Sequence, residues 1–212
     1  MRLVNLTVLP TGTALAVIAP TALEAVYGPS LVAGAVPFAI LAATIIFSAQ
    51  SLLLITTLQA IGKTKPILGI SLAATILDLS AVGLGARPLG TTAGAIGRAL
   101  LAIGMMTLAW WRLRRVLHVP LTHGLSKALL VSVCSAVPVA IIDYALATNL
   151  HVTPLVRLPA LGIVFALSFL LVCRQLFVFS ETDFQLLENA LPRILGRLLD
   201  LLERFLVNRT TA

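Results

Sequence analysis

The chain has 212 residues, of which 59% are hydrophobic and 11% are charged, and its mean hydropathy is +1.05. A soluble domain contains about 45 to 50% apolar and about 25% charged residues, so this composition excludes a water-soluble globule. Because a membrane-spanning helix uses about 20 residues, the apolar content is enough for about six spans. The composition therefore predicts an all-α fold, a polytopic membrane helix bundle.

Six apolar segments are each long enough to cross a bilayer, and short breaks rich in glycine, proline or charge separate them. The amino-terminal segment could instead be a signal peptide with a cleavage site after Ala14-Leu15-Ala16. We favour a span there, because the apolar run continues to Ala22. Residues 1–179 are thus predicted to form a transmembrane bundle with spans at about 3–22, 31–57, 66–86, 90–111, 128–147 and 158–179.

The basic residues are distributed unevenly over the breaks. If the six spans alternate in direction, eleven basic residues fall on one side of the membrane, whereas only Arg87 and Arg157 fall on the other. The positive-inside rule then predicts a multi-pass protein of the cell membrane with both termini in the cytoplasm. Because the net charge of +7 is spread over separate loops, it indicates membrane lipids as partners and no nucleic acid.

Residues 180–212 differ in character from the spans. Ser180-Glu181-Thr182-Asp183 resembles a helix capping box, and apolar residues then recur at helical spacing with charged residues on the opposite face. The pattern predicts an amphipathic cytoplasmic helix, split in two by Pro192. Such a helix either lies at the membrane interface or docks a partner.

Asp78 and Arg98 are ionisable residues within predicted spans, and such residues are functional candidates by default. If Pro88 is the turn between spans three and four, each lies ten residues from it, so both reach about the same depth. They could form a structural ion pair. Alternatively, they line a hydrated cavity in which Arg98 meets an anionic headgroup or Asp78 binds a coupling cation.

Other polar or aromatic residues fall near the predicted ends of spans. Arg174 is close enough to the cytoplasmic end of span six to extend its charge to the headgroups, and Asp143 lies near the outer end of span five. Trp110 and Trp111 precede a basic cluster, as expected of aromatic anchors. We therefore predict an interfacial position for these four residues.

Metal and catalytic signatures are absent from the sequence. Cys134 and Cys173 both lie inside apolar runs, while His118 and His123 share a linker without nearby cysteine or acidic residues. A membrane-embedded transferase needs clustered Asp, His or Arg residues to bind metal and phosphate. We expect no metal, no cofactor and no enzymatic activity.

Glycines and prolines predict helix packing and bending. Gly90-x-x-x-Gly94 matches a motif by which membrane helices approach closely. Pro10, Pro20, Pro37 and Pro138 fall inside predicted spans, where proline kinks a helix.

Three motifs, in this order, resemble a known family: Pro20 with Ala25-Val26-Tyr27-Gly28, then Ala60-Ile61-Gly62-Lys63-Thr64-Lys65, and then Pro88-Leu89-Gly90 with Ala93-Gly94-Ala95-Ile96. The chain resembles the polysaccharide biosynthesis, or O-antigen-flippase-like, branch of the multidrug/oligosaccharidyl-lipid/polysaccharide exporter superfamily. Asp78 stands where that family often has a polar residue. Leu31, three residues after Gly28, stands where the family usually has a tyrosine.

The resemblance implies a transporter that moves a polyprenyl- or dolichyl-linked saccharide across the membrane between two helical lobes. Complete members have about twelve to fourteen spans, so this chain resembles the carboxy-terminal lobe without its first helices. A second transmembrane lobe or subunit is therefore an implied partner. The alternatives are a non-transporting membrane subunit or a truncated fragment and, less favoured, a polytopic glycosyltransferase-type enzyme.

Overall fold

The computed structural model describes residues 2–117, 125–148, 152–176 and 206. Within these residues the backbone is helical throughout, apart from short connections, and contains no strand. The all-α prediction is confirmed. The elements are α1 (Arg2–Val17), α2 (Ala19–Tyr27), the 3-10 helix η1 (Pro29–Gly34), α3 (Ala35–Ala60), α4 (Lys65–Leu89), α5 (Thr91–Leu113), α6 (Leu125–Thr148) and α7 (Pro154–Gln175).

Five of the described helices are long and apolar enough to cross a membrane, counting η1 with α3, and the count rises to six if the bent pair α1–α2 is taken as one span. At about 1.5 Å per residue, the 26 residues of α3 extend about 39 Å, more than a hydrocarbon core of about 30 Å. The predicted segments correspond to these helices. The chain is a multi-pass integral membrane protein.

The first predicted span is bent rather than straight. The helix axis bends by 70° between α1 and α2. Ile18 separates the two helices, with φ −87° and ψ 9°. Pro20 lies in the first turn of α2, the part of a helix where proline is tolerated because its missing N–H has no intrahelical partner. The break lies next to Pro20, one of the expected kinks, whereas α1 and α6 continue as single helices through Pro10 and Pro138. The helical region continues to Tyr27, however, beyond the predicted limit at residue 22.

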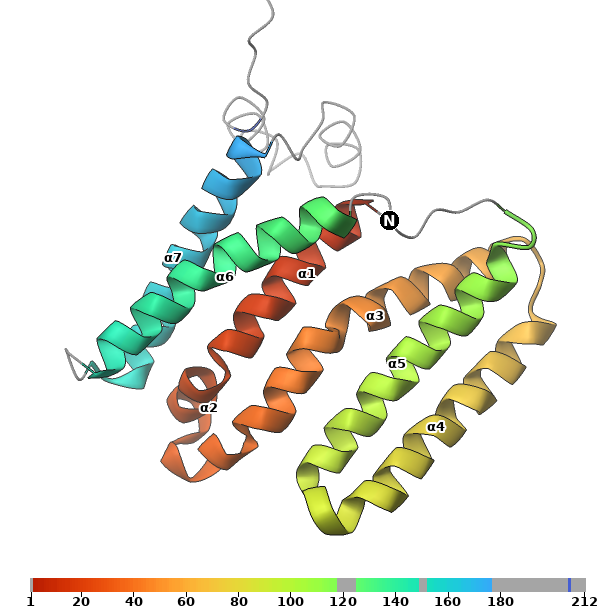
Figure 1. The fold of residues 1–212 in the computed structure, drawn as a ribbon, viewed down its shortest axis with the longest axis horizontal. Coiled ribbons are helices and arrows are strands. Elements are labelled where there is room, and N and C mark those ends of the chain that lie inside the picture. Colours follow the sequence, from red (N-terminus) through yellow and green to blue (C-terminus); the bar gives the residue numbers. More distant parts are fainter. Residues whose placement is uncertain (1, 118–124, 149–151, 177–205, 207–212) are drawn as a thin grey trace, which may run out of the picture.

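The long helices form a single row in the order α7, α6, α1, α3, α5, α4 (Figure 1). Helix α2 lies against α7 and η1. One edge of the row contains the end of α3, the start of α4, the end of α5 and the end of α7, whereas the other contains α2 and the α4–α5 turn. Long helices that follow one another in the chain therefore run in opposite directions, whereas the row neighbours α1 and α6, and likewise α3 and α5, run parallel.

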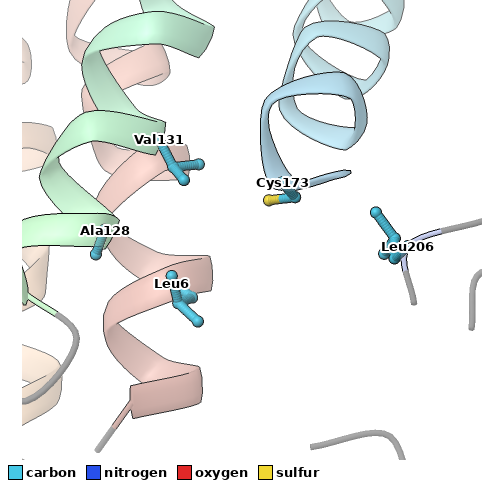
Figure 2. Close-up of a cluster of buried hydrophobic side chains, with 5 residues drawn as sticks. All are labelled: Leu6, Ala128, Val131, Cys173 and Leu206. Atoms are coloured by element: carbon cyan, nitrogen blue, oxygen red, sulfur yellow. The ribbon is translucent and has the colours of Figure 1, made fainter. Parts of the chain in front are cut away.

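Small clusters of buried side chains hold neighbouring helices together. Figure 2 shows Leu6, Ala128, Val131 and Cys173 from α1, α6 and α7, with Leu206 packed against them. Leu206 is the one residue of the predicted tail that the structure describes. It places an apolar position of the tail against the ends of these helices, and the rest of the predicted tail helix lies outside the described residues.

Much of the apolar surface in the row has no protein neighbour. The side chains of Leu68 and Leu84 on α4 are 78% and 83% exposed, and α3, α6 and α7 carry large apolar residues that are 63% to 72% exposed. On α5 the exposure is lower, with Leu100 at 40%. Exposed apolar surface of this extent is unfavourable in water. In a bilayer it contacts lipid, while the helices satisfy the backbone hydrogen bonds internally.

Candidate functional site

Helices α4 and α5 carry the predicted pair Asp78 and Arg98. The turn between the helices is made by Gly90, with φ +52°, a backbone conformation that side chains disfavour. Helix α4 continues through Pro88 to Leu89, so the prediction of Pro88 as the turn is wrong. The two helices pack closely along their length.

Asp78 faces Gly97, the residue before Arg98. A Cβ added to Gly97 would lie 3.0 Å from the Asp78 carbonyl oxygen and 2.8 Å from Val82 Cγ2. Asp78 is half-buried, whereas Arg98 is exposed. Among the described residues, no hydrogen bond or ion pair joins the two.

Asp78 and Arg98 thus lie at about the same level along α4 and α5, but the described structure contains no ion pair between them. Successive residues of a helix are about 100° apart around its axis, and this rotation directs Arg98 away from α4. A role of either residue in binding substrate or a coupling ion stays a prediction.

Close approach of α4 and α5 depends on glycines other than the predicted motif. A Cβ on Gly104 would lie 3.2 Å from Leu77 Cδ1, whereas Gly90 and Gly94 have no neighbour within 4 Å of such a Cβ. Gly97 and Gly104 are also buried. Gly97 and Gly104 thus form a glycine seam on α5, and Gly85 of α4 also approaches α5, because a Cβ there would lie 3.0 Å from Ala93 Cβ. The Gly90-x-x-x-Gly94 prediction is wrong.

A buried polar cluster joins α2, α6 and α7 through Thr21, Asp143 and Arg157. Arg157 Nη2 lies 2.5 Å from Asp143 Oδ1 and donates to Thr21 Oγ1 at 3.0 Å. The Thr21 hydroxyl in turn lies 2.9 Å and 3.0 Å from the two Asp143 carboxylate oxygens. The side chains of Arg157 and Asp143 retain 10% and 16% of their exposure.

The polar cluster changes the interpretation of two residues. Asp143, for which the sequence predicts an interfacial position, forms an ion pair with Arg157. The sequence predicts Arg157 in the break before the sixth span, but it is the fourth residue of α7. Spacing along the sequence could not reveal this cluster, because its members come from three helices and Thr21 lies beyond the α1–α2 bend.

A second buried polar contact joins α1 to α3. Gln50 Nε2 donates to Asn5 Oδ1 at 2.6 Å, and both side chains are buried. Asn5 Nδ2 is buried without a hydrogen-bond partner in the described structure. Amide pairs of this kind hold membrane helices together. The sequence reasoning missed this contact, and the available signal was a pair of amides within two predicted spans.

The predicted aromatic anchors lie at the carboxy-terminal end of α5. The guanidinium of Arg114 lies 5.1 Å from the Trp110 ring centre, and that of Arg115 lies 3.7 Å from the Trp111 ring centre. Such cation–π contacts suit the headgroup region, where the rings meet apolar chains and the charges meet water. Arg174 is exposed in the last turn of α7, close to the helix end as expected.

Apolar grooves lie on both sides of α1, near the middle of the row. One groove, of ≈ 230 Å³, is lined by Thr7, Thr11, Leu15 and Ile45, together with Val8 and Gly12. The other, of ≈ 130 Å³, shares Thr11 and Leu15 and extends to Gly162 of α7. Neither Asp78 nor Arg98 lines these grooves.

The described residues contain no group of three or more His, Cys, Asp or Glu side chains placed to hold a metal ion. His118 and His123 lie outside the described ranges. Comparison of the chain with protein-family models, curated protein sequences and solved structures finds no significant match.

Proposed function

We propose that this protein forms one lobe of a two-lobed flippase for polyprenyl- or dolichyl-linked saccharides. The observation that carries the proposal is the open row of helices. Five helices long and apolar enough to cross a membrane lie side by side with the bent pair α1–α2, and the long helices keep apolar surface without protein neighbours. A second lobe can pack against such a face and enclose a path for substrate between the two.

The order of the three motifs in the sequence supplies the substrate class. A lipid-linked saccharide has a long apolar chain and a polar head, so its carrier needs an apolar surface beside a protected path. The grooves along α1 provide apolar surface of this kind, at the centre of the row. In the simplest arrangement, a second copy of the chain supplies the other lobe.

The test is a flipping assay in vesicles reconstituted with the intact chain. A fluorescent polyprenyl-diphosphate oligosaccharide is incorporated in both leaflets, and dithionite added outside bleaches the outer leaflet. We expect bleaching beyond the outer-leaflet fraction, at a rate that rises steeply with protein density because two lobes must meet. A fluorescent phosphatidylcholine controls for leakage and for unspecific scrambling.

A pair of glycine variants connects this activity to the α1 grooves. Gly162→Leu adds a side chain to the groove beside α7, and Gly83→Leu adds the same side chain on α4. Neither glycine has a neighbour within 4 Å of an added Cβ, so both variants should fold. We expect Gly162→Leu alone to slow flipping several-fold.

Flipping at the protein-free rate at every density, with the helical content intact, would refute transport by this chain. It would favour the second candidate, a non-transporting membrane subunit.

A further inference from the structure

A groove lies between the start of α4 and the end of α5. It lies on the edge of the row that exposes Lys63, Lys65, Arg112, Arg114 and Arg115, which we call the basic edge. Its volume is ≈ 390 Å³, and it combines two cationic side chains, one aromatic ring and an apolar wall. The lining residues are Lys65, Pro66, Gly69, Ile70, Ala73, Leu108, Trp111 and Arg112. The groove does not include the predicted site residues Asp78 and Arg98.

The two cations of this α4–α5 groove lack acidic partners in the described structure. Lys65 and Arg112 are exposed, and neither forms an ion pair with a described residue. The acidic residues within the described ranges are Glu24, Asp78 and Asp143, and none of them lines the groove. Its charge is therefore left for an anion from outside the described chain.

The rest of the lining favours a lipid over a small soluble anion. Gly69 and Ala73 are exposed on the membrane-facing part of α4, and Leu68 and Leu72 beside them are 78% and 62% exposed. The groove is therefore continuous with a surface that contacts lipid tails. Trp111 lines the groove next to Arg112 and is 37% exposed, so its ring can contact both a lipid headgroup and an acyl chain.

We propose that the α4–α5 groove binds one anionic phospholipid. Its phosphate lies at Lys65 and Arg112, and one acyl chain follows Gly69, Ala73 and Leu108. Basic pockets between membrane helices are suited to anionic headgroups, and each basic residue near the surface strengthens the attraction. This binding does not depend on the proposed transport activity.

Tryptophan fluorescence can report this binding directly, because one of the two tryptophans of the chain lines the groove. Trp110→Phe leaves Trp111, which lines the groove, as the single fluorophore. The variant is reconstituted in two sets of phosphatidylcholine vesicles. One set contains a small fraction of dibrominated phosphatidylglycerol, and the other contains the same fraction of dibrominated phosphatidylcholine. We expect markedly stronger quenching by the brominated phosphatidylglycerol.

Charge variants in the same background test the headgroup contact. Lys65→Gln and Arg112→Gln should each reduce the relative association constant of phosphatidylglycerol by about fivefold, and the double variant should abolish most of the preference. Arg87→Gln removes one cation from the opposite end of α4 and should leave the preference unchanged. Circular dichroism verifies that each variant keeps its helical content.

Gly69→Leu tests the acyl contact. No atom lies within 4 Å of a Cβ added to Gly69, so the leucine occupies the groove without displacing α5. We expect a several-fold weaker association with phosphatidylglycerol although both cations remain. Excess glycerol phosphate should not displace the lipid, because it lacks the chains.

Each arm can overturn the proposal. Equal quenching by the two brominated lipids, a phosphatidylglycerol preference that survives the double charge variant, or full binding in Gly69→Leu would each do so. Displacement by glycerol phosphate would identify a free phosphate site instead of a lipid site. None of these outcomes depends on whether the chain flips saccharides.

Discussion

Asp143→Asn should destabilise the protein more than any other single neutralisation of an acidic side chain in the described structure. The substitution keeps the shape of the side chain but removes the charge that faces Arg157 at 2.5 Å. Arg157 would remain charged in a site where its side chain is 10% exposed. The guanidinium would then keep neutral hydrogen-bond acceptors, the Thr21 hydroxyl and the Asp143 backbone carbonyl, while its Nε stays buried without a partner in the described structure.

Loss of one partner from a buried ion pair costs about 3 to 5 kcal/mol. Asp143 and Arg157 retain 16% and 10% of their side-chain exposure and lie near the ends of their helices. We therefore expect about 3 kcal/mol for Asp143→Asn, the lower end of that range. Thr21→Val should cost about 2 kcal/mol, because the hydroxyl hydrogen-bonds with both charged groups.

The measurement is unfolding in mixed micelles by increasing dodecyl sulfate, followed by circular dichroism. A cycle of Asp143→Asn, Arg157→Gln and the double variant gives the coupling energy, expected at about 2 kcal/mol or more. Asp78→Asn is the matched control, because Asp78 has no ion pair with a described residue. We expect it to change stability by less than about 0.5 kcal/mol. Additive effects within about 0.5 kcal/mol, or an equal loss in the Asp78 control, would refute the reasoning.

Three further substitutions test the packing of the row by the same unfolding measurement. Gly97→Leu should lower the free energy of unfolding by about 1 to 3 kcal/mol, because a Cβ there approaches the α4 backbone to 3.0 Å. Gly94→Leu is the control and should be tolerated. Equal losses of stability in the two variants would exclude the glycine seam. Gln50→Leu should lower the free energy of unfolding by about 1 to 3 kcal/mol, because it leaves both polar side-chain atoms of Asn5 unpaired. Adding Asn5→Leu to the same chain should restore most of the lost stability. Leu206→Ala should cost about 2 kcal/mol, since Leu206 is 5% exposed within its cluster; an unchanged midpoint would show that this contact adds no stability.

The helices could be predicted from the sequence because the bilayer imposes a simple constraint. An apolar run that crosses it must satisfy its own backbone hydrogen bonds, and a helix does so. One of the prolines also marked the bend, since Pro20 lies in the first turn of α2 just after the break, although Pro10 and Pro138 lie inside unbroken helices. The direction of α2 was not predictable, because it depends on contacts with α7 and η1 that have no local signature.

Depth in the membrane was more predictable than orientation around the helix axis. Counting residues placed Asp78 and Arg98 at nearly the same level, and the contact of Asp78 with Gly97 agrees with that count. Which face of α5 meets α4 depends on where the small residues lie, and the glycines at 97 and 104 decide this contact. A search for the smallest residues facing α4, rather than for a motif of fixed spacing, would have come closer.

Partners from distant helices were not predictable, and the buried cluster shows why this matters for charge. Arg157 counted as one of two basic residues on the sparse side of the membrane, yet Asp143 neutralises it inside the protein. Arg87 is then the exposed basic residue at that edge of the described structure. At the opposite edge, the described ranges expose Lys63, Lys65, Arg112, Arg114, Arg115 and Lys127.

The asymmetry that predicts a cytoplasmic location for the basic edge is therefore sharper in the fold than in the sequence. A buried, paired arginine contributes little to the field outside the protein, whereas exposed and unpaired cations contribute fully. The cytoplasmic leaflet is also the one rich in anionic lipids. The same cations would thus both favour this orientation and hold an anionic lipid in the α4–α5 groove, since each effect requires positive charge that the protein does not neutralise itself.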